Sequence, residues 1–561
     1  GMPYESSNKQ PIPIKIQCMP GIQRDGTRYH ARALIDGQWI RFQNDWPQKM
    51  GGYTSRLLGN KTIVGSLYSV QRSSSSDIYM GRNDKLSYFN ITNKNAIGTE
   101  IDRTPNQVNP GTGKPYFQAD PNGQNLWCFT NLSYTITKSS INVNDIIVQY
   151  GHNRSSISSQ LSTDPLSPDG FLFYGGVDSN DALQVVVDTN RTSATYPAGI
   201  PIQASGGVIA LAPIVIAYGD DGALQWCFPN KITKWSTGIG DDLVVNKLFL
   251  DGTKVVAAAL YQGSVLFWTL QNLWRVTWIP SQDTSAAGTL SASIVMQGTS
   301  ILSAQSIVSY QNYLFWVGQK QFYMFNGTIQ RIENKMCQNY FFDNLDEDNL
   351  GKICGFANPN FDEMTWLFPV SGVNNGENSR FVTYNLSKAS WTSGELTRSA
   401  AVGPTTNYGW PILTSSQIEV SQVGSSVIES YPIWQHEVGF NKVLQGAIYK
   451  IRSYIQYPIV TLFDQNPSPD TNCLIESVRV ENDFIQKGEM ICKIYNWKYA
   501  NARQELATAS PTVTFTEDTP FIDGIKSQGR LVSVYFESDT IDGYFAAGQS
   551  LLNIVPGDYN L

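Results

Sequence analysis

The chain has 561 residues, of which 16% are charged and 12% aromatic, and its formal net charge is −7. This composition is typical of a β-rich globular protein and excludes a disordered chain or a coiled coil. The acidic balance argues against a protein that grips nucleic acid along its surface, although not against one that lets DNA pass. No apolar run reaches about 18 residues, so no membrane-spanning segment is expected.

The first sixty residues differ in charge from the rest of the chain. Residues 1–61 hold nine basic and four acidic residues, a net charge of +5, which leaves −12 for the remainder. Residues 1–20 contain four prolines and the alternating run IKIQ, which predicts an extended arm or edge strand. The opening GMPYESSNKQ lacks the basic and apolar regions of a signal peptide, so export by that route is not expected.

Two interpretations of this basic segment stay open. It is either a solvated arm or a segment that docks an acidic neighbouring subunit. The candidate contacts to such a partner are Arg24, Arg28, Arg32 and Arg41. The first three are spaced by four residues, as they would be along one face of a helix, although Gly26 disfavours a helix there.

Aromatic hairpins recur along the middle of the chain. The stretch YLFWVGQKQFYMFNGTIQ at 313–330 predicts two strands, LFWV and FYMF, which need neighbouring strands to bury their apolar faces. Similar aromatic positions recur every 40 to 50 residues or so, which is typical of β-propeller blades: Tyr79, Trp127, Tyr174, Trp226, Trp268, Trp316 and Trp366. Two of them share the local pattern W-C-F-x-N. Phe315, Trp316, Phe322 and Phe325 are expected to pack between blades.

After about residue 424 this pattern ends. Short strands such as CLIESVRV, MICKIYNW and GRLVSVYFES, separated by Pro, Asp and Gly clusters, predict a β-sandwich. We therefore expect an all-β protein with an N-terminal arm and platform segment over 1–55, a β-propeller of about seven blades over 56–424, and a C-terminal β-sandwich over 425–561 that completes the platform.

The sequence offers no reaction, cofactor or metal site. The seven cysteines form no CxxC pair, which favours buried reduced thiols, and the three histidines lack ligand spacing. Asp362 and Glu363 are adjacent, and adjacent strand residues point to opposite faces, so they cannot flank one bond as a glycosidase pair does. No P-loop, Rossmann fingerprint or nucleophile elbow is present. We expect a protein that is not an enzyme.

Two further clusters have structural interpretations. The carboxylates Asp343, Asp346, Glu347 and Asp348 lack the spacing of an EF-hand loop and predict a solvated acidic rim or lumen. His436 and Glu437 stand near the expected boundary between propeller and sandwich, so they are candidates to fix that junction by hydrogen bonds.

Several segments together resemble one protein family. PGIQRDGTRYHARALIDGQWIRFQNDWPQKMGGY, GGVIALAPIVIAYGDDGALQW, FWVGQKQFYMFNG, NPNFDEMTWLFP, RFVTYNLSKASWTSGEL, the WQHEVG junction, QGRLVSVYFES and YFAAGQSLLNIVPGD resemble, in this order, segments of tail nozzle proteins of short-tailed double-stranded DNA bacteriophages, also called tail hub or stabilisation proteins. The likeness spans most of the chain and is weakest over 98–205.

This resemblance implies a structural protein of the virion tail, assembled in the host cytoplasm. Such nozzles look like hexameric rings below the portal and its adaptor, with a platform made by the chain ends and a propeller projecting distally. They continue the channel for the genomic DNA, which passes without sequence-specific binding, and they hold tail fibres or spikes or gating proteins. An acidic body fits a lumen that repels DNA phosphates.

Two alternatives belong to other classes. One is a receptor- or glycan-binding β-propeller module, which would use the blade tips and inserted loops. The other is a propeller hydrolase such as a sialidase, but the chain has no S-x-D-x-G-x-x-W repeat.

Overall fold

Short strands joined by tight turns form most of the regular structure. The computed structural model describes residues 11–556 except 59–60, 121–122, 124, 137–140, 154–169, 177–179, 284–285, 462–472, 498–503, 505–506 and 520. At the predicted Asp-Asp-Gly turn, Asp221 and Gly222 have φ values of 62° and 72°. These residues belong to the four-residue connection 219–222 between two paired strands. Glycine adopts positive φ freely and Asp tolerates it, which explains the sequence preference for Asp-Gly there.

In the described part of the chain, seven consecutive antiparallel sheets follow one another along residues 64–436. We call them blades 1 to 7. Blade 1 contains β8 (Val64–Gln71), β9 (Ser75–Arg82), β10 (Leu86–Thr92), β11 (Ala96–Ile97) and β12 (Ile101–Asp102); blade 2, β13 (Asn125–Ile136), β14 (Ile141–Asn153), β15 (Leu172–Gly176) and β16 (Gln184–Val185); blade 3, β19 (Gly207–Leu211), β20 (Ile214–Tyr218), β21 (Ala223–Trp226) and β24 (Lys247–Phe249).

The remaining blades follow the same plan. Blade 4 contains β25 (Val255–Tyr261), β26 (Ser264–Thr269), β27 (Asn272–Ile279) and β28 (Thr289–Gln297); blade 5, β29 (Val308–Tyr310), β30 (Tyr313–Val317), β31 (Phe322–Phe325) and β32 (Ile329–Ile332); blade 6, β33 (Cys354–Asn358), β34 (Glu363–Pro369), β35 (Asn378–Asn385) and β36 (Ser390–Glu395); blade 7, β37 (Arg398–Val402), β38 (Ile412–Ser415), β41 (Ile433–His436) and β7 (Tyr53–Leu57).

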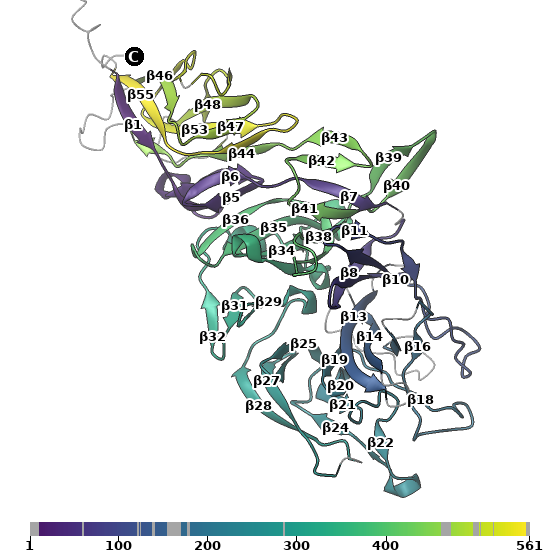
Figure 1. Cartoon of the computed structure of the whole chain (residues 1–561). Coiled ribbons are helices and arrows are strands. Elements are labelled where there is room, and N and C mark those ends of the chain that lie inside the picture. The colour runs from purple at the N-terminus through teal and green to yellow at the C-terminus, as the bar shows by residue number, and fades with distance from the viewer. Residues whose placement is uncertain are drawn as a thin grey trace, which may run out of the picture.

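The first strands of the blades close into a ring. β8 contacts β13, β13 contacts β19, and β19 contacts β25, while β29 contacts β33 and β33 contacts β37. Between β25 and β29 the 3-10 helix η5 (Ala304–Ser306) makes the contact, and β37 returns to β8. The sheets therefore form a closed seven-bladed β-propeller, which confirms the predicted fold class (Figure 1).

Blade 7 is completed by a strand from the opposite end of the chain. β7 pairs antiparallel with β41, with Thr54 opposite Gln435. Its other edge pairs in parallel with β42 (Asn441–Leu444), which continues into β43 (Ala447–Lys450). The propeller thus has a closing strand from the first sixty residues, so the last blade does not end at an open edge beside β41.

The central hairpin packs between its neighbours as predicted. Trp316 of β30 faces Trp268 of blade 4, with ring centroids 5.1 Å apart. On the other face, Phe322 of β31 packs against Trp366 of blade 6 at 5.2 Å. Because successive strand residues point to opposite faces, one hairpin contributes apolar side chains to both inter-blade interfaces.

The predicted aromatic positions are not all equivalent. Trp127 lies on the first strand of blade 2 and Tyr174 on the third strand of the same blade. Trp226 lies on the third strand of blade 3, so the two W-C-F-x-N matches occupy different places in their blades. Blade 7, which has Leu413 on its second strand, shows no aromatic there. The predicted number of seven blades agrees with the structure because two errors cancel: blade 2 is counted twice, through Trp127 and Tyr174, and blade 7 is not counted.

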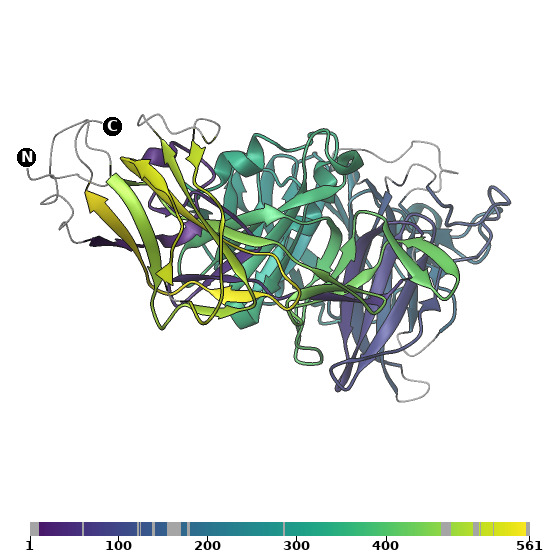
Figure 2. The same ribbon diagram turned by 90° about the horizontal axis from the view of Figure 1, so that it is seen from above.

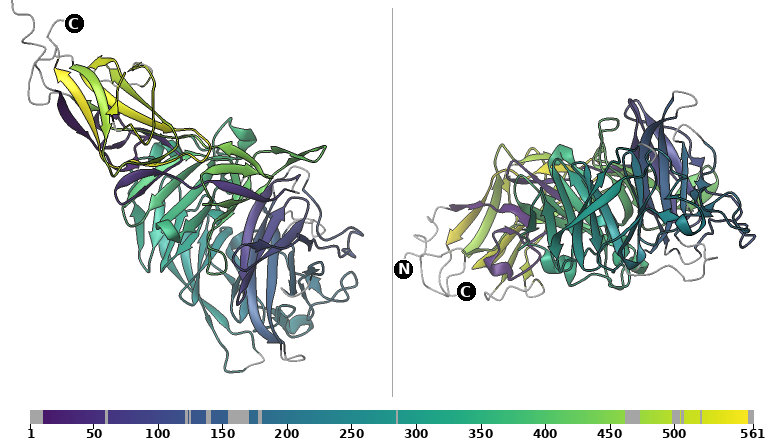
Figure 3. Two further views of the ribbon diagram at one scale, coloured as in Figure 1. Left: turned by 45° about the horizontal axis from the view of Figure 1, so that its top comes forward. Right: turned by 90° about the horizontal axis from the view of Figure 1, so that it is seen from below.

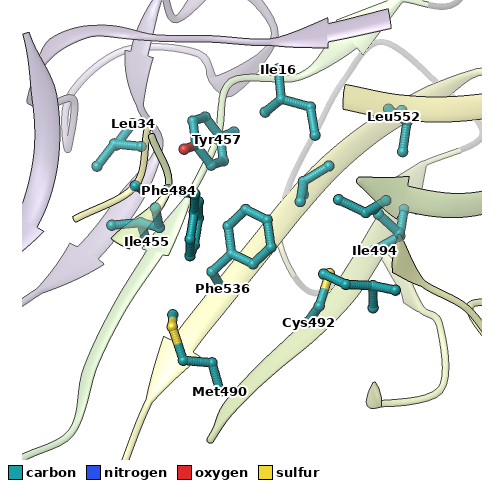
Figure 4. Packing of buried hydrophobic residues seen from close by; sticks show 14 of the residues in the cluster. Ile16, Leu34, Ile455, Tyr457, Phe484, Met490, Cys492, Ile494, Phe536 and Leu552 are labelled. Carbon is teal, nitrogen blue, oxygen red and sulfur yellow. The ribbon is translucent and has the colours of Figure 1, made fainter. Parts of the chain in front are cut away.

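Both ends of the chain build the platform. Its three sheets contain β1 (Ile12–Ile16), β55 (Ser550–Pro556), β46 (Cys473–Val480), β51 (Phe521–Ile522) and β52 (Ser527–Gly529); β4 (Asp36–Gln38), β44 (Ser453–Gln456), β53 (Leu531–Ser538), β48 (Met490–Trp497), β49 (Thr508–Ala509), β45 (Val460–Thr461) and β50 (Val513–Phe515); and β47 (Ile485–Lys487), β54 (Tyr544–Ala546), β6 (Trp46–Lys49) and β5 (Ile40–Gln43). In one core, Ile16 and Leu34 lie among Tyr457, Phe484 and Phe536 (Figure 4). The alternating run IKIQ is an edge strand, as predicted, because among the described strands β1 pairs with β55 alone.

Smaller elements complete the described chain. They are the pairs β2 (Met19–Ile22) with β3 (Ala33–Leu34), β17 (Val187–Asp188) with β18 (Ile200–Pro201), β22 (Ser236–Thr237) with β23 (Val244–Val245), and β39 (Glu419–Val423) with β40 (Ser426–Ser430), together with helix α1 (Gln338–Phe342) between blades 5 and 6. Residues 1–10 of the predicted arm lie outside the described residues.

The molecule is elongated, with the platform at one end and the propeller at the other (Figures 1, 2 and 3). The sheets differ from the predicted limits of 55/56 and 424/425. The second limit lies at the turn of the β39–β40 hairpin, and blade 7 extends through β41 to His436. The reason is the exchange of strands: β7 crosses into the propeller sheet, while β42 and β43 extend that sheet towards the platform.

Candidate functional site

A buried ion cluster lies where the platform meets blades 6 and 7. Arg41, on β5 of the platform, contacts Glu363 at the start of β34 and Glu437 directly after β41. The Nη2 atom of Arg41 lies 3.0 Å from Oε1 of Glu363 and 2.7 Å from Oε1 of Glu437. Nη1 donates a second bond to Oε2 of Glu437 at 2.7 Å. One guanidinium therefore bridges three separate sheets.

This cluster is shielded from water. The side chains of Arg41 and Glu363 are only 2% and 4% exposed, and the guanidinium lies over the ring of Phe361, 3.5 Å from its centroid. Burial lowers the pKa of Arg41, but the carboxylates of Glu363 and Glu437 raise it by more than burial lowers it. The net pKa lies above the ordinary value, so the guanidinium stays charged. Burial raises the pKa of Glu363 above its ordinary value although Arg41 opposes this. Glu363 depends on Arg41, because without it the buried carboxylate would be an uncompensated charge, whereas Arg41 also has Glu437 as a partner.

Two glycines allow the chain to approach this cluster. A Cβ on Gly51 would lie 3.0 Å from Cα of Glu437, and one on Gly52 would lie 2.3 Å from the carbonyl oxygen of Asn441. No side chain fits in such spaces. The Gly-Gly pair that precedes β7 is therefore required for β7 and the loop after β41 to lie side by side.

His436 holds a second arginine, Arg398, beside this cluster. Its Nε2 accepts a hydrogen bond from Nε of Arg398 at 3.1 Å, and its ring stacks on Tyr53 with centroids 5.0 Å apart. Burial, and then the charge of Arg398, lower the pKa of His436 well below its usual range. A neutral imidazole that accepts at Nε2 carries its proton on Nδ1. Of the two predicted junction residues, Glu437 bonds to Arg41 of the platform, whereas the hydrogen bond of His436 lies within blade 7.

The four candidate partner arginines do not form one surface. Arg24 pairs with Asp36 and donates to Ser393 Oγ of blade 6 at 3.0 Å, so its charge is used within the chain. Arg28 lies in a short 3-10 turn and donates to Gln504 at 2.9 Å. The α-helical spacing is not realised, because β2 and β3 flank this segment. Arg41 is buried, so it cannot contact a partner as predicted; only Arg32 is exposed.

The acidic run lies on a loop between α1 and β33. Asp346 accepts hydrogen bonds from the amide of Asp348 at 3.1 Å and from Asn349 at 2.9 Å, which closes a turn. Asp343, Glu347 and Asp348 are exposed, so these carboxylates form a solvated rim of blade 6. Among the described residues, no group of three or more His, Cys, Asp or Glu side chains could hold a metal ion.

The centre of the propeller is a narrow hollow of about 330 Å³. Every described residue that lines it is uncharged, and the set includes Ser66, Tyr68, Cys128, Gln305 and Cys354. This volume lies at the lower end of small-molecule pockets. The hollow is therefore neither acidic nor wide enough for duplex DNA, and the acidic run lies elsewhere.

Other expectations about reactive groups can be placed. The thiols of six cysteines are free: Cys18, Cys128, Cys227, Cys337, Cys354 and Cys492. Asp362 and Glu363 point to different partners: Asp362 accepts from Ser387 Oγ at 2.6 Å, whereas Glu363 faces Arg41. Among the described helices, none is long and apolar enough to cross a membrane.

Comparisons with known proteins provide little information about identity. No protein-family model matches the chain, and no curated protein matches its sequence. Among solved structures, it aligns with a chain of the mitotic checkpoint complex at 9% identity and a TM-score of 0.29, covering 76% of this chain and 93% of that chain. It aligns with BamB from Moraxella catarrhalis at 10% identity and a TM-score of 0.28, covering 72% of this chain and 97% of that chain. With Sqt1 from Saccharomyces cerevisiae the identity is 8% and the TM-score 0.30, covering 69% of this chain and 98% of that chain. Such TM-scores carry no argument, so the propeller assignment rests on its closed ring of sheets.

Proposed function

We propose that the chain is a structural subunit of a tail nozzle of a short-tailed double-stranded DNA bacteriophage. In this role it forms a ring of identical copies, with six as the number that the resemblance implies, below the portal and its adaptor. The ring continues the channel through which the genome leaves, and it carries tail fibres, spikes or gating proteins. The protein acts without catalysis or a cofactor.

One observation carries this proposal: both ends of the chain combine in a single platform, and a separate propeller projects from it. β1 pairs with β55 across more than 500 residues of sequence, and Arg41 of the platform is paired with Glu363 and Glu437 of two blades. A part that transmits load between two neighbours in a tail needs such a fixed connection. The order of the family-like segments along the sequence supports the same role.

The small central hollow supports a DNA channel that lies outside the single propeller. Because that hollow is small and lined by uncharged residues, duplex DNA does not thread a single propeller. In the proposed assembly the lumen lies between subunits, around the axis of the ring. The net charge of −12 beyond residue 61 favours passage without adhesion, because like charges repel the phosphates.

Mass measurement and imaging of the assembled tail test this function. The proposal expects a ring of copies of this chain; a single isolated copy in each particle contradicts it. Glycan-array binding by a protein that forms no ring would instead favour the receptor-binding module.

A deletion tests the platform more locally. Removing residues 1–20 takes away β1 and the arm before it, so attachment of the nozzle to the adaptor is expected to weaken. Tails that assemble normally with this deletion would show that the arm is not a docking segment.

A further inference from the structure

A second hollow, outside the propeller centre, lies where blades 6 and 7 face β42 and the segment before β5. It has a volume of about 520 Å³. Its charged lining residues are the cations Arg380, Arg398 and Lys442 and the carboxylates Glu395 and Glu419. Lys442 and Glu419 neutralise each other through two contacts of 2.9 Å. What remains is two guanidiniums facing one exposed carboxylate, Glu395.

Arg398 is a buried cation whose hydrogen-bond partners are neutral. It is 2% exposed, and its Nε and Nη1 atoms donate to His436 and to the carbonyl oxygen of Thr397. The guanidinium also lies over the rings of Tyr53 and Trp434, at 4.6 and 5.1 Å. Its Nη2 atom is buried and has no hydrogen-bond partner in the described part of the chain. Glu419 acts on Arg398 electrostatically, but its hydrogen bonds go to Lys442. Because no carboxylate of the described residues is hydrogen-bonded to this buried guanidinium, binding of an anion here is favoured.

A second unpartnered donor lines the same hollow. The hydroxyl of Ser379 is buried and makes no hydrogen bond to a described residue. Ser379 stands at a β-bulge, since Phe368 lies opposite Arg380 and Pro369 lies opposite Asn378. A bulge interrupts the alternation of side chains along a strand, which explains how neighbouring residues of β35 can line one hollow.

Arg380 supplies a further free cation at this place. It is half-buried and lies over the ring of Tyr340 at 4.6 Å, and it makes no ion pair with a described residue within 4.0 Å. Guanidinium groups bind carboxylates and phosphates in a planar, two-pronged manner, and a hydroxyl donor adds to such a site.

We propose that this hollow is an oxyanion site, in which Arg398, Arg380 and Ser379 bind a carboxylate, phosphate or sulfate group. The group comes either from a free small anion or from an acidic side chain of another protein. Arg398 supplies the buried charge, Ser379 a hydroxyl donor, and Arg380 a second guanidinium nearer to solvent. His436 is a positioning residue, because it holds Arg398 without neutralising it. This site does not depend on the proposed nozzle function.

Thermal unfolding of the full chain in the presence of sulfate or phosphate tests the site. Sodium chloride at equal ionic strength serves as the reference, because sulfate also stabilises proteins without binding, in a manner that does not saturate. We expect a saturable rise of the unfolding midpoint in the wild type. In Arg398→Gln the saturable rise is lost, and in Arg380→Gln and Ser379→Ala the anion binds at least tenfold more weakly.

Arg331→Gln is the matched control, because it removes an exposed arginine of blade 5 and should leave the anion response unchanged. If Arg398→Gln does not fold, Arg380→Gln and Ser379→Ala decide the question. The proposal is overturned if neither sulfate, phosphate nor a hexaglutamate peptide gives a saturable shift, or if both of these variants respond as the wild type does.

The peptide arm distinguishes the two sources of the oxyanion. Saturation by hexaglutamate at concentrations at least tenfold lower than by sulfate, abolished by Arg380→Gln, indicates an acidic segment of another protein. Equal or weaker binding of the peptide indicates a free small anion. Either result supports an oxyanion site at these residues.

Discussion

Removing Arg41 tests the junction between platform and propeller. In Arg41→Met the carboxylate of Glu363, whose side chain is 4% exposed, keeps no cationic partner, whereas Glu437 is 17% exposed and can be hydrated. Breaking a buried ion pair by deleting one partner costs about 3–5 kcal/mol. We expect a loss of this size in the free energy of unfolding, measured by urea denaturation at neutral pH.

The dependence on pH gives this prediction its sign. Without Arg41, burial and the charges of Glu437 and Asp362 remain, and all of them raise the pKa of Glu363, so it lies above the value already raised in the wild type. A carboxyl group whose pKa is higher in the folded chain than in the unfolded chain loses stability as the pH rises through the folded pKa. The deficit of Arg41→Met should therefore shrink as the pH falls below neutral and Glu363 takes up a proton.

Two variants complete the experiment. Arg41→Met with Glu363→Gln should recover part of the loss, because the buried charge is gone. Arg479→Met breaks a pair with Glu481 in which the side chains are 40% and 35% exposed, and such pairs contribute about 0.2–1 kcal/mol. If Arg41→Met loses no more than Arg479→Met, or its deficit does not change with pH, the account of the junction is wrong.

Three further predictions concern the propeller and the platform. In Gly206→Ala the new Cβ would lie 2.0 Å from the carbonyl oxygen of Val255, so the free energy of unfolding in urea denaturation should fall by about 1–3 kcal/mol. In the control Gly409→Ala the new Cβ has nothing within 4 Å, so the change should be less than about 0.5 kcal/mol. Equal effects of the two substitutions would contradict this packing. Burial lowers the pKa of Lys49 from 10.5 to about 8, so between these two pH values the folded chain has lost a proton that the unfolded chain still holds. The stability of the wild type should therefore rise with pH over this range relative to Lys49→Met. Curves of unfolding free energy against pH that run parallel for the two proteins would contradict this. Thr54→Pro places a proline in β7, which lies between β41 and β42, so the strand loses a backbone N–H donor there. The free energy of unfolding should fall by about 1–3 kcal/mol, and trypsin should cleave the propeller faster. Unchanged digestion would mean that β7 does not hold blade 7 together.

Local patterns were sufficient to predict the repeating part of the fold. The strands LFWV and FYMF and the Asp-Gly turn at 221–222 depend on residues close in sequence. The packing of Trp316 between blades follows from the alternation of side chains along its strand. The sequence does not identify the strand on which an aromatic residue lies: it assigns Tyr174 to a blade of its own, because third strands are as aromatic as second strands. Blade 7 was missed because Leu413 stands where its neighbours have tryptophan or tyrosine.

The junction depends on contacts between distant segments, which one sequence does not reveal. Arg41 and Glu363 are 322 residues apart, and nothing in either local pattern indicates the other. The basic charge of residues 1–61 suggested an outward-facing docking arm, but Arg24 and Arg41 turn inward. Nothing in the sequence distinguishes Arg398 and Ser379, because an arginine and a serine in strands are common. The only local signals were the Gly51-Gly52 pair and the neighbouring His436 and Glu437.

The most direct test of the proposed role is a cryo-EM map of assembled particles that contain this chain. The account predicts a ring of copies around the tail axis below the portal adaptor, with platforms joined to one another, propellers pointing away from the head, and the DNA path between subunits. A map in which the chain lies off that axis as single copies, or in which DNA runs through one propeller, would contradict it.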